Sequence, residues 1–126
     1  MRIGVVNLKR GQTGEYIGRG GYGKDRSPLA NCYLIGKDGS REQVIAKYRR
    51  WLWAQMNNGN PEVVGELRRL LALARREEGV KLACYCTPLL CHGLIIKSCL
   101  EWLDQVEGGP LVAEAIELGG VIARCG

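Results

Sequence analysis

The sequence predicts a small three-layer α/β/α domain with a mostly parallel sheet. Two short apolar stretches, residues 3–8 and 80–85, have the length and composition of buried strands. Between them, apolar residues recur at helical spacing over residues 41–57 and 61–78. A crossover of two helices suits strands that run in parallel, so we expect both strands near the centre of the sheet, with helices on both faces.

Both central helices carry start signals. Ser40 followed by Gln43 has the pattern of a capping box. Asn60 followed by Pro61 suits an N-cap and a first helical position. Trp51 falls on the apolar stripe of its helix and is predicted to lie in the core, whereas Trp53 falls off that stripe and its role stays open.

The remaining segments complete a single domain over residues 1–126. Residues 16–17 suit a short strand, and residues 94–106 suit a third long helix in which Cys99 lies on the apolar stripe. Residues 104–126 are predicted to hold a C-terminal helix and a tail. The apolar stretch at the N-terminus is too short for a signal peptide, and no apolar run reaches membrane-spanning length. We therefore expect a cytoplasmic protein.

The chain has a formal net charge of +5. This charge permits a phosphate-bearing partner. Much of it lies in arginine pairs inside the predicted helices, which is typical of a solvated helix face, so a nucleic-acid polymer is the less favoured partner. The sequence leaves homo-oligomer formation open.

Residues 82–93 are the most informative stretch of the chain. They hold three of the six cysteines and the single histidine, and they join a predicted strand to a predicted helix. In open α/β sheets, ligands bind just outside the carboxyl ends of the strands. We therefore expect the functional site at this turn.

Three interpretations of this turn compete. In the favoured one, Cys86, Cys91 and His92 line a reactive or ligand-binding site, because a helix N-terminus lowers a thiol pKa and attracts anions. In the second, Cys84, Cys86, Cys91 and His92 bind zinc, although their spacing is tighter than in common zinc sites. In the third, the cysteines are buried small side chains with a structural role only.

A glycine-rich loop over residues 18–27 formally contains G-x-G-x-x-G. A dinucleotide-binding loop would open a helix directly, whereas Ser27-Pro28 interrupts this one. The loop carries Arg19, Lys24 and Arg26, so it suits either a cradle for a phosphate or carboxylate or a solvated basic surface.

Several segments together resemble an uncharacterised bacterial and phage family, the domain of unknown function 4326. The resemblance runs from about residue 5 to residue 103 and is carried by residues 5–8, 16–19, 27–31, 35–42, 48–52 and 82–93. It implies a small α/β fold and no established reaction. The chain departs from the family pattern at Cys32, Tyr85 and Leu94, where the family usually has Pro, Trp and Asp.

Two functional hypotheses follow. The first is a domain that binds or processes a small nucleotide-like anion without a cofactor, for example a phage-type protein that sequesters a nucleotide signal. Arg19 would pair with a phosphate, Asn31 would contact a sugar or base, and Cys86, Cys91 and His92 would form the floor. The alternative is a zinc-stabilised module that contacts nucleic acid or protein.

Whether the protein is an enzyme stays open. Cleavage of an N-glycosidic bond generally needs a carboxylate near the sugar, and residues 82–93 supply none, which favours binding over catalysis. Under the first hypothesis, Arg19→Ala should abolish ligand binding and leave the melting temperature nearly unchanged.

Overall fold

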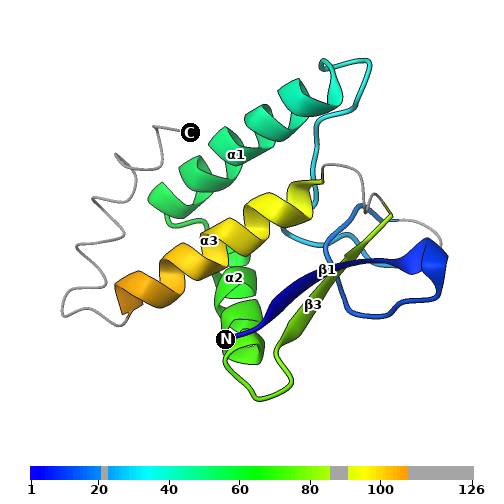
Figure 1. The fold of residues 1–126 in the computed structure, drawn as a ribbon. Helices are drawn as coiled ribbons and strands as arrows, with labels where there is room; N and C mark the ends of the chain where they lie inside the picture. Colours follow the sequence, from blue (N-terminus) through cyan, green and yellow to red (C-terminus); the bar gives the residue numbers. More distant parts are fainter. Residues whose placement is uncertain (21–22, 86–90, 108–126) are drawn as a thin grey trace.

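A computed structural model describes residues 1–20, 23–85 and 91–107 of the chain (Figure 1). The predicted strands and long helices within these ranges are present. In chain order the elements are β1 (Ile3–Asn7), the short 3-10 helix η1 (Leu8–Arg10), β2 (Glu15–Tyr16), α1 (Arg41–Asn57), α2 (Pro61–Ala74), β3 (Val80–Cys84) and α3 (His92–Glu107).

The three strands form one parallel sheet in the order β1-β3-β2. Val5 is aligned with Leu82 in the first pair, and Tyr16 is aligned with Ala83 in the second. The predicted small α/β fold with a mostly parallel sheet is therefore confirmed. Within the described residues, β2 pairs with the far side of β3 and β1 lies at an edge, which differs from the expectation that the first strand lies near the centre.

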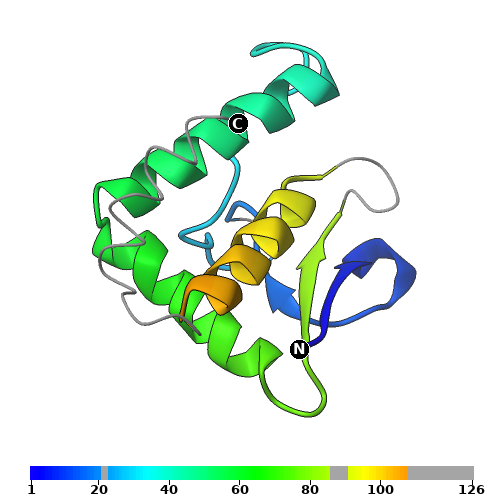
Figure 2. The same ribbon diagram turned by 60° about the vertical axis from the view of Figure 1, so that its left-hand side comes forward.

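Val80, Leu82 and Cys84 of β3 belong to the hydrophobic core that all three helices share. Lys81, between Val80 and Leu82, is exposed, whereas Ala83, between Leu82 and Cys84, is buried. Figure 2 shows the helices gathered on one side of the strands. Within residues 1–20, 23–85 and 91–107, helices thus cover one face rather than the two that were predicted. The helix predicted within residues 104–126 lies largely beyond the described residues.

The helix starts follow the predicted capping chemistry. Gln43 N–H donates to Ser40 Oγ, and Ser40 N–H donates to the Gln43 side chain, which completes a capping box. Asn60 Oδ1 accepts from Glu62 N–H, and Pro61 occupies the first turn of α2. These caps satisfy N–H groups that have no partner inside a helix, so they fix where each helix begins.

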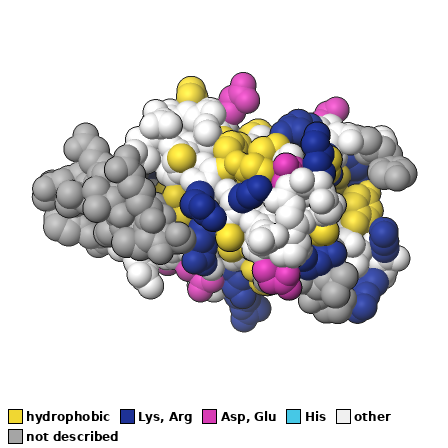
Figure 3. Space-filling model, turned by 90° about the horizontal axis from the view of Figure 1, so that it is seen from above, with side chains coloured by type: hydrophobic (Ala, Val, Ile, Leu, Met, Phe, Trp, Pro, Cys, Tyr) yellow, Lys and Arg dark blue, Asp and Glu magenta, His cyan; other side chains and the backbone are white. Residues whose placement is uncertain are grey.

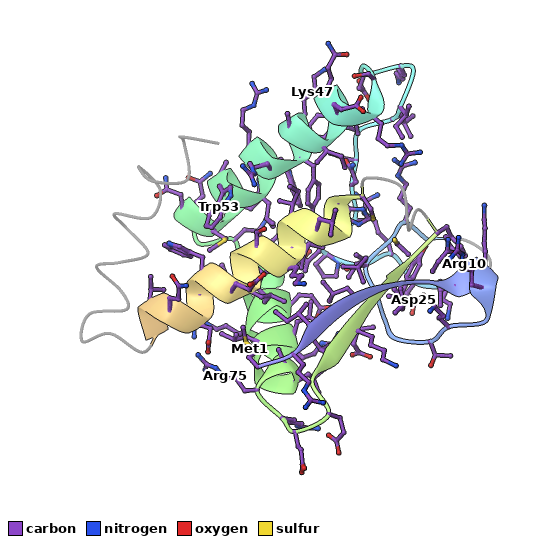
Figure 4. All side chains as sticks on the ribbon, viewed as in Figure 1. Met1, Arg10, Asp25, Lys47, Trp53 and Arg75 are labelled. Atoms are coloured by element: carbon purple, nitrogen blue, oxygen red, sulfur yellow. The ribbon has the colours of Figure 1, made fainter. Side chains whose placement is uncertain are left out.

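The core is formed by one stripe from each helix and the covered face of the sheet. Trp51 packs on the core as predicted and contacts Tyr48, with ring centroids 5.5 Å apart. Trp53 on α1 (Figure 4) also packs on the core and meets Trp102 of α3 edge to face at 5.1 Å. Both indoles are therefore occupied in packing. No helix among the described residues combines the length and the apolar character needed to cross a membrane.

Candidate functional site

A cavity of about 560 Å³ lies at the carboxyl end of the sheet. Its walls come from the end of β3, the start of α3, the irregular segment between β2 and α1, and the first turns of α1. Four of the five residues predicted to bind a ligand line this cavity together: Arg19, Asn31, Cys91 and His92. The fifth, Cys86, lies outside the described residues.

His92 is the first residue of α3 and is buried at the back of the cavity. Its Nε2 lies 2.7 Å from the carbonyl oxygen of Ile17. A carbonyl only accepts, so Nε2 carries the proton and Nδ1 keeps its lone pair. Burial lowers the pKa of His92, the Ile17 hydrogen bond opposes this effect, and burial is the larger cause. We infer that His92 is the neutral Nε2–H tautomer at neutral pH.

The ring of His92 also contacts Tyr48 edge to face, with centroids 5.1 Å apart. The Tyr48 hydroxyl is itself buried and donates to Leu29 O at 2.6 Å. Burial raises the pKa of Tyr48 well above its ordinary value, so this hydroxyl remains a donor. His92 and Tyr48 thereby hold two points of the irregular segment against the helices.

Cys84 and Cys91 face each other across the strand-to-helix turn. Their Sγ atoms are 3.0 Å apart, and both side chains are buried and line the cavity. Cys91 Sγ accepts from Gly93 N–H at 3.3 Å and lies 3.7 Å from His92 Nδ1. The structure therefore brings together three members of the alternative metal set.

A zinc site at these residues would need Cys86, which the structure does not describe. Within the described ranges, no group of three or more His, Cys, Asp or Glu side chains has an arrangement suited to a metal ion. Two thiolates that share one tetrahedral zinc through bonds of about 2.3 Å lie further apart than 3.0 Å. The observed spacing of Cys84 and Cys91 thus differs from that of a metal-bound pair.

Arg19 has a structural role that the sequence did not reveal. Its Nε donates to Asn31 O at 2.7 Å, and one terminal nitrogen donates to Tyr33 O at 2.8 Å. The guanidinium thus joins two stretches of the irregular segment while its exposed side lines the cavity. An arginine has five N–H groups, so donors remain for a ligand.

Asn31 is buried, and its side chain orients the chain locally. Its Oδ1 accepts from Tyr33 N–H at 2.9 Å, an Asx turn. This bond directs the amide group Nδ2 away from Tyr33, and Asn31 lines the cavity. The next residue, Cys32, is exposed, so the two neighbours face different environments.

The start of the glycine-rich loop is shaped by Tyr16. Its hydroxyl donates to Arg19 O at 2.6 Å. A Cβ on Gly18 would lie 2.5 Å from that hydroxyl, so a larger residue there would require the Tyr16 ring to shift. Lys24 lies over the Tyr16 ring at 5.9 Å. Within this loop, residues 21 and 22 lie outside the described residues.

Sequence reasoning missed several residues of the cavity. Tyr33 and Tyr85 supply aromatic surface, and Arg41 brings a second cation from the first position of α1. The exposed side chains of Leu34 and Ile35 line the cavity as well. The capping box at Ser40 had located the start of α1, but nothing in the sequence placed that start beside the cysteine turn.

The charge of the cavity has one sign. Among the described residues, the charged side chains that line it are Arg19 and Arg41, and no Asp or Glu lines it. Two guanidinium groups on a partly apolar surface favour a planar or phosphorylated anion over a cation.

Other basic residues are paired or dispersed. Arg69 contacts Glu15 and Glu66, and these hydrogen bonds raise its pKa. Arg75 pairs with Asp104 at 2.9 Å. On the face shown in Figure 3, Lys and Arg side chains lie in separate groups with Asp and Glu between them. This distribution agrees with the prediction that the arginine pairs lie on solvated helix faces.

Of three comparisons with known proteins, one found a match. No curated protein and no solved structure matches the sequence. Residues 6–102 match the family described as "Domain of unknown function (DUF4326)". This match covers most of the chain, including every residue of the cavity described above. The chain therefore belongs to the DUF4326 family.

Proposed function

We propose that the cavity binds a small nucleotide-like anionic ligand. The observation that carries this proposal is the charge of its lining: two arginines, and no carboxylate among the described residues. A volume of about 560 Å³ lies within the range of small-molecule sites. The position at the carboxyl ends of parallel strands is where α/β sheets bind their ligands.

The lining supplies a group for each part of a nucleotide. Arg19 and Arg41 would contact the phosphate, since guanidinium groups bind phosphate oxygens in pairs of hydrogen bonds. Tyr33 and Tyr85 offer ring faces and edges to a base. Asn31 Nδ2 would donate to a sugar or base oxygen. Cys91 and His92 would form the floor; Cys86, the other residue predicted there, lies outside the described residues.

Binding without turnover fits this lining better than catalysis. Chemistry at an N-glycosidic bond needs a carboxylate near the sugar, and the described lining supplies none. The one imidazole donates its Nε2–H to Ile17 O and turns Nδ1 toward Cys91, so neither nitrogen points at a substrate. A protein that sequesters a small nucleotide signal would need no more than these contacts.

The test compares two substitutions that each add one negative charge without changing shape. Asn31→Asp keeps the oxygen that accepts from Tyr33 N–H and places a carboxylate in the cavity. Gln12→Glu keeps the oxygen that accepts from Asn7 N–H, and Gln12 does not line the cavity. Isothermal titration calorimetry would use inorganic phosphate, a nucleoside, a mononucleotide and a cyclic dinucleotide as ligands.

We expect a phosphorylated member of this panel to bind the wild type and the Gln12→Glu variant alike. Binding to Asn31→Asp should weaken by at least about tenfold, because a carboxylate repels the phosphate at short range. Equal binding to all three proteins, or no binding by any phosphorylated ligand, would contradict the proposal. Native mass spectrometry of the same samples would reveal bound zinc, the outcome expected of the alternative module.

A further inference from the structure

We propose that Cys84 and Cys91 are a reactive dithiol that hydrogen peroxide oxidises to an intramolecular disulfide. The two sulfur atoms lie 3.0 Å apart, and both residues are thiols. A disulfide bond is about 2.05 Å long, so the sulfurs need to approach by only about 1 Å. The pair joins the last residue of β3 to the residue before α3.

The environment of Cys91 favours it as the attacking sulfur. Gly93 N–H donates to Cys91 Sγ at 3.3 Å, at the N-terminal end of a helix, and both features stabilise negative charge on sulfur. Both cysteines are only 2% exposed but line the cavity. A small oxidant such as hydrogen peroxide can therefore reach them through the cavity, whereas a bulky reagent cannot.

Two other cysteines provide internal comparisons. Cys32 is exposed and has no described sulfur beside it. Cys99 is fully buried and donates to Met56 Sδ at 3.0 Å, and burial raises its pKa far above the ordinary value. Cys32 should react with any reagent and Cys99 with none. The dithiol should discriminate between reagents by size.

The reaction balances in two steps. Cys91 sulfur attacks one oxygen of hydrogen peroxide, the O–O bond breaks, and one water leaves with the thiol proton, which gives a sulfenic acid. Cys84 sulfur then attacks Cys91 sulfur, the S–O bond breaks, and a second water leaves. Two thiols are oxidised, and one peroxide is reduced to two waters. A dithiol reductant reverses the result by thiol–disulfide exchange.

The experiment treats the full chain with hydrogen peroxide, removes the peroxide, denatures the protein and alkylates the remaining thiols with N-ethylmaleimide. Chymotrypsin can cut after Tyr85 and Leu90, between the two cysteines. We expect a cross-linked pair of peptides that contain Cys84 and Cys91, with a mass about 2 Da below their sum. Dithiothreitol should restore both thiols. A Cys32→Ser variant and a Cys86→Ser variant should form the same cross-link.

Two results would overturn the proposal. One is full alkylation of Cys84 and Cys91 after peroxide treatment that already oxidises Cys32. The other is a cross-link that involves Cys86 in place of either partner. Because the mapping is made on the wild-type chain, it does not depend on whether a substituted protein folds.

Discussion

The cavity wall that comes from β3 and α3 is buried and made of sulfur and imidazole, whereas the wall formed by residues 18–20 and 31–35 is irregular and carries the charge of Arg19. We call the first the sulfur wall (Cys84, Cys91 and His92) and the second the loop wall. The sulfur wall is positioned by a strand ladder and a helix. The loop wall is positioned by Arg19, which donates to the carbonyl oxygens of Asn31 and Tyr33, and by Tyr48, which donates to Leu29 O just before residue 31.

The two walls differ in what holds them in place and in which polar groups they leave accessible. Backbone ladders and helix packing distribute stability over many residues, so the sulfur wall provides a fixed floor. The loop wall depends on a few side chains, so a single substitution can loosen it. It is also the wall where polar groups remain accessible, which suits contact with a ligand.

Removing the imidazole should have the largest effect, because His92 belongs to the sulfur wall but binds the segment that leads into the loop wall. His92→Ala leaves Ile17 O without its donor and opens a cavity beside Tyr48. We expect a loss of about 2–4 kcal/mol in the free energy of unfolding, measured by urea denaturation. Ser98→Ala, on the exposed face of the same helix, should change it by less than about 0.5 kcal/mol. Similar losses in both variants would refute the role of His92.

Two glycine-to-alanine substitutions test how tightly α3 packs on the sheet. A Cβ on Gly93 would lie 3.0 Å from side-chain atoms of Ile17 and of Val5, so we expect Gly93→Ala to cost about 1–3 kcal/mol. Gly65 lies in α2 with nothing within 4 Å of its Cβ position. Gly65→Ala should therefore stabilise the protein by about 0.5–1 kcal/mol. Thermal unfolding of both variants measures the difference, and a stabilising Gly93→Ala would mean that α3 packs more loosely.

Acidification should lower the free energy of unfolding through His92 of the sulfur wall. The pKa of His92 is lower in the folded state than its ordinary value of 6.5, so below about pH 6.5 the unfolded chain binds the proton more readily. The stability that neutral His92 contributes is complete above that pH and is lost as the pH falls. The free energy of unfolding then decreases by at most about 1.4 kcal/mol per pH unit.

This chain has a single histidine, so a His92→Gln variant provides a direct reference. Between pH 7 and pH 5, the free energy of unfolding of the wild type should fall more steeply than that of the variant. Parallel profiles would show that His92 does not titrate differently in the two states.

Arg19→Ala should loosen the loop wall with the smallest cost in stability. The sequence suggested that this substitution would leave the melting temperature nearly unchanged, but the guanidinium donates to Asn31 O and Tyr33 O. We expect a loss of about 1 kcal/mol, since the site is exposed. Arg10→Ala, at an exposed arginine of η1, is the control and should be nearly neutral. Equal melting temperatures for wild type and Arg19→Ala would show that these two hydrogen bonds contribute no stability.

Local sequence signals predicted the sulfur wall well. The apolar run over residues 80–85, the turn and the following helical pattern placed Cys91 and His92 at the carboxyl end of a strand. Capping residues Ser40 and Asn60 located α1 and α2. Each of these features depends on neighbours within a few residues, and local preferences are strong there.

The loop wall could not be predicted in the same way, because it depends on contacts between distant residues. Nothing near His92 in the sequence indicates that its ring donates to Ile17 O. Arg19 was recognised as a cation at the site, but its bonds to Asn31 and Tyr33 carbonyls require the folded path of the chain. The order of the strands could not be predicted either, because the two-residue strand β2 gave too weak a signal in the sequence.

The bonds that hold the loop wall have a consequence for aggregation. Main-chain acceptors left exposed at the margin of a small sheet can template the strand of another molecule. In the segment that follows β2, the carbonyl oxygens of Ile17, Leu29, Asn31 and Tyr33 already accept from His92, Tyr48 and Arg19 of the same molecule. These four acceptors are therefore not open to the strand of a neighbouring molecule.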